Sequence, residues 1–131
     1  MTWTQRLLIA QMGTIFGILS LVSFIAGLEY YFFFALMLAA GLLAAWLARE
    51  KFFKEGFILG FFTWWFAILV QGIFIGVYLE NNPQYQDLAQ DLPLGVQALT
   101  LLGGSAAAVG FGVMSGGIAT LANLVRLRFS R

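Results

Sequence analysis

The sequence of 131 residues contains no cysteine and no histidine. Without these residue types the chain cannot form disulfides, thiol nucleophiles, Cys/His metal sites or a Ser-His-Asp triad. It also contains no Gly-x-Ser-x-Gly motif and no glycine-rich phosphate loop followed by lysine. We therefore expect no catalytic residues, no metal site and no cofactor, and predict that the protein is not an enzyme.

Charged residues are equally scarce, at 10% of the chain, whereas hydrophobic residues make up 61%. Ordinary soluble domains contain about 25% charged and about 45–50% apolar residues. A chain this short has too much surface for its volume to bury so many apolar side chains in a water-soluble core. The composition therefore predicts an integral membrane protein, and the net charge of +1 argues against a nucleic-acid partner.

Four apolar stretches are long enough to cross a bilayer, which takes about 20 residues in a helix. The first three cover about 7–28, 31–48 and 56–79, with a turn of two or three residues at Glu29 after the first. The first stretch is too long for the apolar core of a signal peptide, so we expect it to remain as a span. The fourth stretch, 94–125, is too long for a straight span.

Two adjacent glycines, Gly103 and Gly104, fall where the fourth stretch could break, because glycine lowers helix stability by about 1 kcal/mol relative to alanine. We predict a short interfacial helix over about 91–102, with Asp91 as N-cap and Pro93 in its first turn, followed by a span over about 104–125. One unbroken, tilted helix is the alternative. The predicted fold is a single all-α domain over residues 1–131, a four-transmembrane-helix bundle with this interfacial helix before the fourth span.

The basic residues predict the orientation of these spans. All seven fall on one side of the membrane. The charged residues of the first and third loops, on the other side, are all acidic. By the positive-inside rule both termini are then cytoplasmic. Basic side chains near an anionic leaflet also predict contacts with lipid headgroups. The candidates for these contacts are Arg49, Lys51, Lys54, Arg126, Arg128 and Arg131, and Arg6 is the seventh basic residue.

No acidic or basic residue lies within the predicted spans, which argues against an autonomous proton-coupled transporter. Neutral polar side chains are present, and Thr63 and Gln71 lie well inside the third span. Such groups mostly form hydrogen bonds between helices. The alternative is a polar track for an ion or small solute. Two adjacent tryptophans in the same span, Trp64 and Trp65, point about 100° apart, so that one can face lipid while the other packs inside. The alternative is a surface for a hydrophobic cofactor.

Small residues recur every four positions in the fourth span and form one face of a helix. We call this face the helix-docking ridge, because small residues let another helix approach closely. It either packs against another helix of the same chain or docks a partner subunit or second copy. The ridge consists of Gly104, Ala108, Gly112, Gly116 and Thr120.

Two motifs around the third span suggest a family. Phe53-Lys54-Glu55-Gly56-Phe57 opens the span, and Asn82-Pro83 is followed by Tyr85 after it. Over 48–87 the chain resembles the four-helix membrane proteins classed as domain of unknown function 4199, known mainly from Bacteroidota. Its third loop is shorter than is usual in that family. The resemblance implies a bacterial inner membrane and implies no activity.

Together these observations predict a small inner-membrane protein with several membrane spans. Its expected role is that of a non-enzymatic accessory, assembly or interaction subunit that acts through glycine-rich helix packing. The expected partners are membrane lipids and either another membrane protein or a second copy of the chain. The alternatives are a small channel or transporter component with a neutral polar track, or a binder of lipid or a hydrophobic cofactor.

Overall fold

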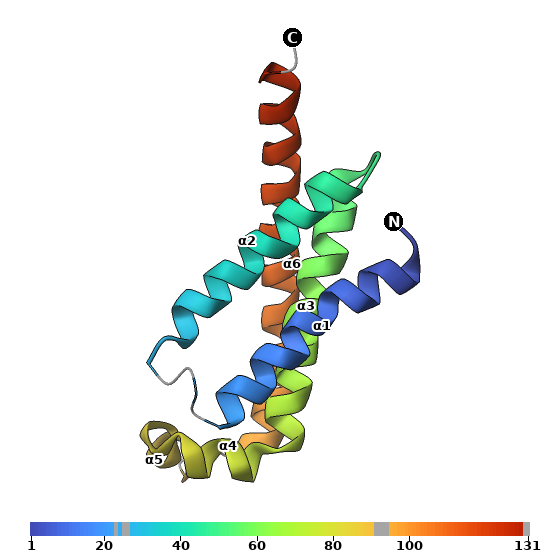
Figure 1. Cartoon of the computed structure of the whole chain (residues 1–131). Coiled ribbons are helices and arrows are strands. Elements are labelled where there is room, and N and C mark those ends of the chain that lie inside the picture. The colour runs from blue at the N-terminus through green and yellow to red at the C-terminus, as the bar shows by residue number, and fades with distance from the viewer. Residues whose placement is uncertain (23, 25–26, 91–94, 130–131) are drawn as a thin grey trace.

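A computed structural model of the chain describes residues 1–22, 24, 27–90 and 95–129 (Figure 1). All regular structure in these ranges is helical, which confirms the predicted all-α class. In chain order the elements are α1 (Trp3–Leu21), α2 (Glu29–Leu47), α3 (Phe52–Ile73), α4 (Ile75–Asn81), the 3₁₀ helix η1 (Pro83–Tyr85), α5 (Gln86–Gln90) and α6 (Val96–Phe129).

Within the described residues three helices, α2, α3 and α6, are long and apolar enough to cross a membrane. They contain 19, 22 and 34 residues. At 1.5 Å per residue α6 is about 51 Å long, well beyond the roughly 30 Å of a hydrocarbon core. The helix α1 also has 19 residues, but its first turns carry Gln5 and Arg6 and it is not one of these three.

The antiparallel pair of α3 and α6 forms the centre of the molecule (Figure 1). The helix α1 packs along α3, and α2 packs against both α3 and α6. The N-terminus and the turn between α2 and α3 lie toward one end, whereas α4 and α5 lie at the other (Figure 1). The last turns of α6 project past the start of α3.

Glycines bring the backbones of α3 and α6 into direct contact. A Cβ atom added at Gly56 of α3 would lie 2.6 Å from the carbonyl oxygen of Ser115. One added at Gly116 of α6 would lie 2.8 Å from the carbonyl oxygen of Phe53. Because lipid tails are as apolar as the side chains, association of helices in a membrane depends on such close van der Waals packing. Larger residues at these positions would separate the two helices.

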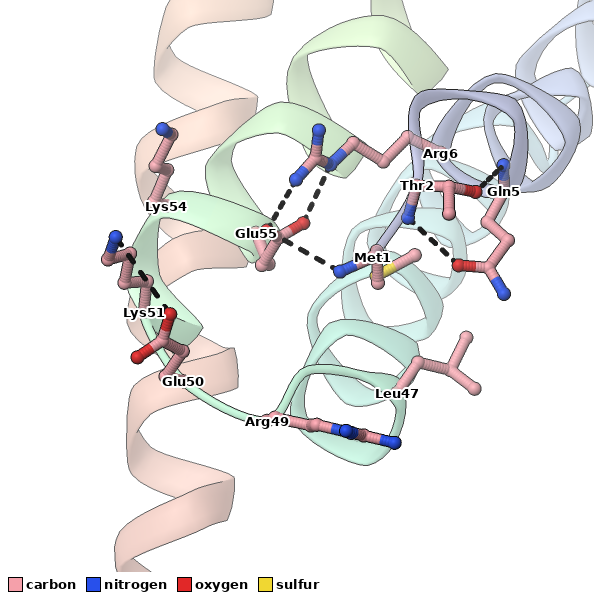
Figure 2. A pocket seen from close by; sticks show the side chains of 10 residues that line it. All are labelled: Met1, Thr2, Gln5, Arg6, Leu47, Arg49, Glu50, Lys51, Lys54 and Glu55. Atoms are coloured by element: carbon pink, nitrogen blue, oxygen red, sulfur yellow. Dashed lines mark hydrogen bonds and ion pairs between the residues drawn. The ribbon is translucent and has the colours of Figure 1, made fainter.

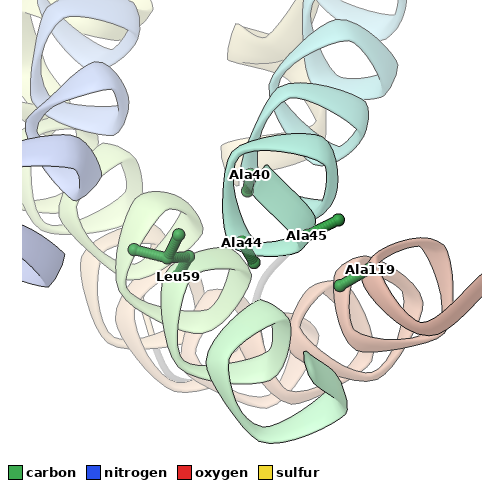
Figure 3. Close-up of a cluster of buried hydrophobic side chains, with 5 residues drawn as sticks. All are labelled: Ala40, Ala44, Ala45, Leu59 and Ala119. Carbon is green, nitrogen blue, oxygen red and sulfur yellow. The ribbon is translucent and has the colours of Figure 1, made fainter. Parts of the chain in front are cut away.

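The core where α2 meets this pair is built from small side chains (Figure 3). Leu59 is fully buried there, and it is the largest member of the cluster. Small side chains let three helices converge at short distance, which increases the number of dispersion contacts. The cluster consists of Ala40, Ala44 and Ala45 of α2, Leu59 of α3 and Ala119 of α6.

The first helix begins earlier and ends earlier than the predicted span over 7–28. Thr2 caps it, because its hydroxyl accepts a hydrogen bond from the Gln5 backbone N–H at 3.2 Å while the Gln5 side chain accepts one from the Thr2 N–H. Gly27 has a φ of +77°, outside the helical region. The predicted turn at Glu29 is wrong, since Glu29 is the first residue of α2, but the second helix is confirmed to within two residues.

The third predicted span, 56–79, is wrong beyond Ile73. The backbone turns at Phe74, with φ −104° and ψ 34°, and α4 then runs across the end of the bundle (Figure 1). The Gln97 side chain donates a hydrogen bond to the Gly72 carbonyl at 2.9 Å. This contact satisfies one of the carbonyl groups that the end of α3 leaves without a helical partner.

The predicted short helix over 91–102 is also wrong, because α6 continues without a break through Gly103–Gly104. The observed helix is the unbroken alternative. The Trp64 indole donates a hydrogen bond to the Gly104 carbonyl at 3.0 Å, and Ile68 fills the space above the Gly104 α-carbon. Packing against α3 outweighs the low helix propensity of glycine. A break would also leave backbone groups without hydrogen bonds in an apolar environment, which is costly. The predicted cap of the short helix lies outside the described residues.

Replacement of Gly13 by alanine tests the contact between α1 and α3. An added Cβ atom at Gly13 would overlap the Thr63 carbonyl oxygen. We expect Gly13→Ala to lower the free energy of unfolding by about 1–3 kcal/mol, as overpacking does elsewhere. Gly110→Ala is the control, because Gly110 has no atom within 4 Å of an added Cβ. Equal unfolding curves for the two variants in detergent micelles would contradict the packing described.

Candidate functional site

The helix-docking ridge of α6 faces α3 within the same chain. Ala108 is fully buried, Gly104 packs against Ile68, and a Cβ at Gly112 would lie 2.9 Å from the Phe57 carbonyl oxygen. Of the alternatives weighed from the sequence, packing within the chain is therefore the one observed for these positions. A second helix cannot reach this face unless α3 leaves it.

The last ridge residue, Thr120, lies at the end of the contact with α3. Its hydroxyl donates a hydrogen bond to the Gly116 carbonyl at 2.9 Å, and the residue is half-buried. A threonine hydroxyl bonded to its own helix in this way needs no partner from another helix. Thr120 therefore ends the ridge and offers no further polar contact.

A different set of α6 residues faces away from the rest of the chain. A Cβ added at Gly103, Gly110 or Gly117 would have no atom within 4 Å. Between these glycines lie the exposed Ala107 and Met114. We call the whole face the outer stripe, which consists of Gly103, Ala107, Gly110, Met114, Gly117, Leu121 and Leu124. The stripe differs from the predicted four-residue spacing of small residues, because its glycines recur every seven residues.

The predicted polar track is not continuous in the structure. Thr63 and Gln71 are both buried on α3, two turns apart. The Gln71 amide donates a hydrogen bond to the Ser20 hydroxyl of α1 at 2.8 Å, whereas the buried Thr63 hydroxyl has no partner. Between them lies the apolar contact of Ala67 with Phe16. The two polar groups therefore share no contact.

The two tryptophans of α3 both bond to α6. The Trp64 ring stacks on Phe111, with ring centroids 4.2 Å apart, and also contacts Phe33 at 4.4 Å. The Trp65 indole N–H donates to the Ser105 hydroxyl at 3.3 Å. Both residues are half-buried. Their rings thus hold α3 against α6, whereas the sequence predicted inward packing for one of the two at most.

A basic pocket of about 620 Å³ opens at the end of the molecule that carries the N-terminus (Figure 2). It lies between the start of α1, the end of α2 and the start of α3. Three of the predicted headgroup residues, Arg49, Lys51 and Lys54, line it. The remaining lining residues are Met1, Thr2, Gln5, Arg6, Leu47, Glu50 and Glu55.

An ion pair between Arg6 and Glu55 forms one wall of this pocket (Figure 2). The guanidinium donates two hydrogen bonds to the carboxylate, at 2.8 Å and 2.6 Å, and also lies 4.8 Å above the Trp3 ring. Only 12% of the Arg6 side chain and 9% of the Glu55 side chain are exposed. Both residues lie one position outside the predicted spans over 7–28 and 56–79, and no pairing between them was predicted. Their opposite charges at the same end of two neighbouring helices were the available signal.

The other predicted headgroup residues lie away from the basic pocket. Arg126 and Arg128 are exposed in the last turns of α6, where Arg126 donates a hydrogen bond to the Asn123 side chain at 3.2 Å. Arg131 lies outside the described residues. The predicted set is therefore divided between a pocket and the projecting end of one helix.

At the opposite end, Glu29 is buried next to two tyrosines. The Tyr78 hydroxyl donates to one Glu29 carboxylate oxygen at 3.4 Å, the other carboxylate oxygen has no partner, and the Tyr78 and Tyr85 rings stack 5.9 Å apart. Burial and the negative charge of Glu29 raise the pKa of Tyr78. The Asn82 amide donates to the Ser20 carbonyl at 3.0 Å, which fixes the segment after α4 beneath α1.

Fold and pockets together define an all-α chain with three helices able to cross a membrane, an apolar outer stripe and a basic pocket. Comparison with family models, with curated proteins and with solved structures finds no match to this chain. The family resemblance noted from the sequence therefore stays a prediction.

Removal of one partner of the Arg6–Glu55 pair should be costly. In Arg6→Met the buried carboxylate would lose both guanidinium hydrogen bonds and keep only the Met1 ammonium, 3.9 Å away. We expect a loss of about 3 kcal/mol in the free energy of unfolding, at the lower end of the cost of breaking a buried ion pair. The double variant Arg6→Met/Glu55→Met should recover part of this loss, because the buried carboxylate is gone and only the Met1 ammonium loses its partner. The measurement is a double-mutant cycle of unfolding in mixed micelles. Additive effects of the two single changes would show that the pair contributes nothing.

Proposed function

We propose that the protein is a non-enzymatic interaction subunit of a membrane that assembles through the outer stripe of α6, first with a second copy of itself. The observation that carries this proposal is the spacing and exposure of the stripe. Its members follow one another by alternating steps of four and three residues from Gly103 to Leu124. A seven-residue repeat of this kind is the pattern of helices that pack by inserting side chains of one into gaps of the other.

The composition of the stripe supports a second copy as the occupant. Gaps at Gly103, Gly110 and Gly117 alternate with larger exposed side chains, and Met114 is 53% and Leu121 63% exposed. One surface therefore supplies both the projections and the gaps. Two identical helices, parallel and related by a two-fold axis along the membrane normal, can then interlock without a change of register.

The arrangement of the helices supports four spans with both termini in the cytoplasm. We include α1 as a span, since its 19 residues reach about 28 Å. The Arg6–Glu55 ion pair lowers the cost of the polar start of α1. All described basic residues then lie at the cytoplasmic end, as the positive-inside rule requires. The resemblance given above favours the bacterial inner membrane.

The length of α6 adds a second reason for assembly. Gly116 packs against Phe53 at the start of α3, and the last turns of α6 project past that start (Figure 1). This extension exposes apolar side chains, among them Leu121, Leu124 and Phe129. A second α6 running parallel would cover the two leucines, which belong to the outer stripe. Exposed apolar surface of this kind marks interaction sites.

Single cysteines test the interface, because the chain has none of its own. Oxidation of Met114→Cys in vesicles should yield a disulfide-linked dimer. The control is Val109→Cys, which is similarly exposed at 48% but directed to another side of α6, and which should yield little dimer. Equal crosslinking at both positions would indicate random collision, and no crosslinking at position 114 would exclude the proposed pair.

A bulky residue in the stripe should remove the dimer without unfolding the chain. Gly110→Leu places its side chain in open space of the monomer, so its unfolding curve should be unchanged. Combined with Met114→Cys, it should reduce crosslinking at least several-fold. Gly112→Leu is the matched comparison, because it meets Phe57 and should destabilise the monomer itself. Undiminished crosslinking in the Gly110→Leu variant would contradict assembly through the outer stripe.

A further inference from the structure

The basic pocket carries more positive charge than its carboxylates neutralise. Four basic side chains and two carboxylates line it. Arg6 and the Met1 ammonium are both engaged with Glu55, and the Lys51 ammonium lies 3.9 Å from Glu50. The remaining cations, Arg49 and Lys54, are exposed and supply the excess. A pocket of this charge favours an anion.

The start of α3 adds to the positive electrostatic potential of the pocket. Lys51 precedes the helix with a φ of 55°, and no side chain caps the first turn. The backbone N–H groups of Phe52, Phe53 and Lys54 therefore carry the partial positive charge of a helix N-terminus without a side-chain acceptor. On its own this feature would be ordinary. Here it lies beside two exposed cations in a cavity.

The surroundings of the pocket indicate what kind of anion it accommodates. Leu47 forms part of its lining, and next to it the Trp46 side chain is 75% exposed. On the other side Trp3 is 58% exposed. Exposed tryptophans beside basic residues are typical of the boundary between headgroups and acyl chains. An anion with attached acyl chains meets complementary surface on both sides.

We propose that the basic pocket binds the phosphate of an anionic phospholipid, between Arg49, Lys54 and the start of α3, with the acyl chains along Leu47. The volume of about 620 Å³ is ample for a glycerophosphate headgroup. The two carboxylates can accept hydrogen bonds from headgroup hydroxyls, which a zwitterionic choline lacks. The site thus prefers phosphatidylglycerol to phosphatidylcholine. This inference does not depend on the outer stripe.

Native mass spectrometry of the full chain in detergent, titrated with phosphatidylglycerol or phosphatidylcholine, tests the proposal. We expect one retained phosphatidylglycerol and no retained phosphatidylcholine. Arg49→Gln/Lys54→Gln should weaken retention about 30-fold, because each basic side chain at an anionic surface contributes about a fivefold step. The matched control Arg126→Gln/Arg128→Gln removes the same charge from the end of α6, and it should change retention less than threefold.

Two further measurements distinguish lipid binding from binding of free phosphate and from loss of folding. Inorganic phosphate in excess should not displace the lipid, and displacement would show that the pocket binds phosphate as such and would overturn the assignment to a lipid. The charge-preserving variant Arg49→Lys/Lys54→Arg should retain the lipid, which separates loss of binding from loss of folding. Equal losses in the pocket variant and the α6 control would also overturn the proposal, because they would indicate only diffuse attraction.

Discussion

The close approach of α3 and α6 is the constraint on which the rest of the structure depends. Glycines on both helices bring backbone against backbone, with positions such as Gly56 and Gly116 too tight for any Cβ atom. In hydrocarbon there is no hydrophobic force between helices, so such contact and the hydrogen bonds of Trp64 and Trp65 to α6 stabilise the pair. The helices α1 and α2 then pack onto the pair, α1 through Gly13 and α2 through an alanine surface that includes Ala44.

This constraint divides α6 into two faces with different roles. The ridge containing Gly112 is consumed by α3, so it holds the monomer together and is not free for a partner. The glycines of the outer stripe, such as Gly110, contribute nothing to the monomer and lower the helix propensity of α6. The proposed contact with a second copy would explain why glycines occur at these positions. The basic pocket lies where the starts of α1 and α3 come together with the end of α2.

Composition and apolar length were enough to predict an all-helical chain and the second helix. They were not enough to predict where helices end, because the ends depend on contacts between distant segments. The Gln97 side chain donates a hydrogen bond to the Gly72 carbonyl at the end of α3, and the Trp64 indole donates one to the Gly104 carbonyl within α6. The low helix propensity of Gly103 and Gly104 predicted a break in the fourth stretch, but packing against α3 keeps α6 helical there. The basic loop was predicted as a headgroup contact, but the Arg6–Glu55 pair that builds its pocket needs a tertiary arrangement that single-sequence patterns do not contain.

The central claim is that α6 has one face closed by α3 and an opposite face open to the membrane. Spin labels at single cysteines from position 103 to 121, in excess lipid that keeps copies apart, report collision with dissolved oxygen at each position. The account predicts high accessibility at positions 103, 110 and 117 and low accessibility at 104, 108, 112 and 116. A flat profile, or maxima on the ridge, would contradict it.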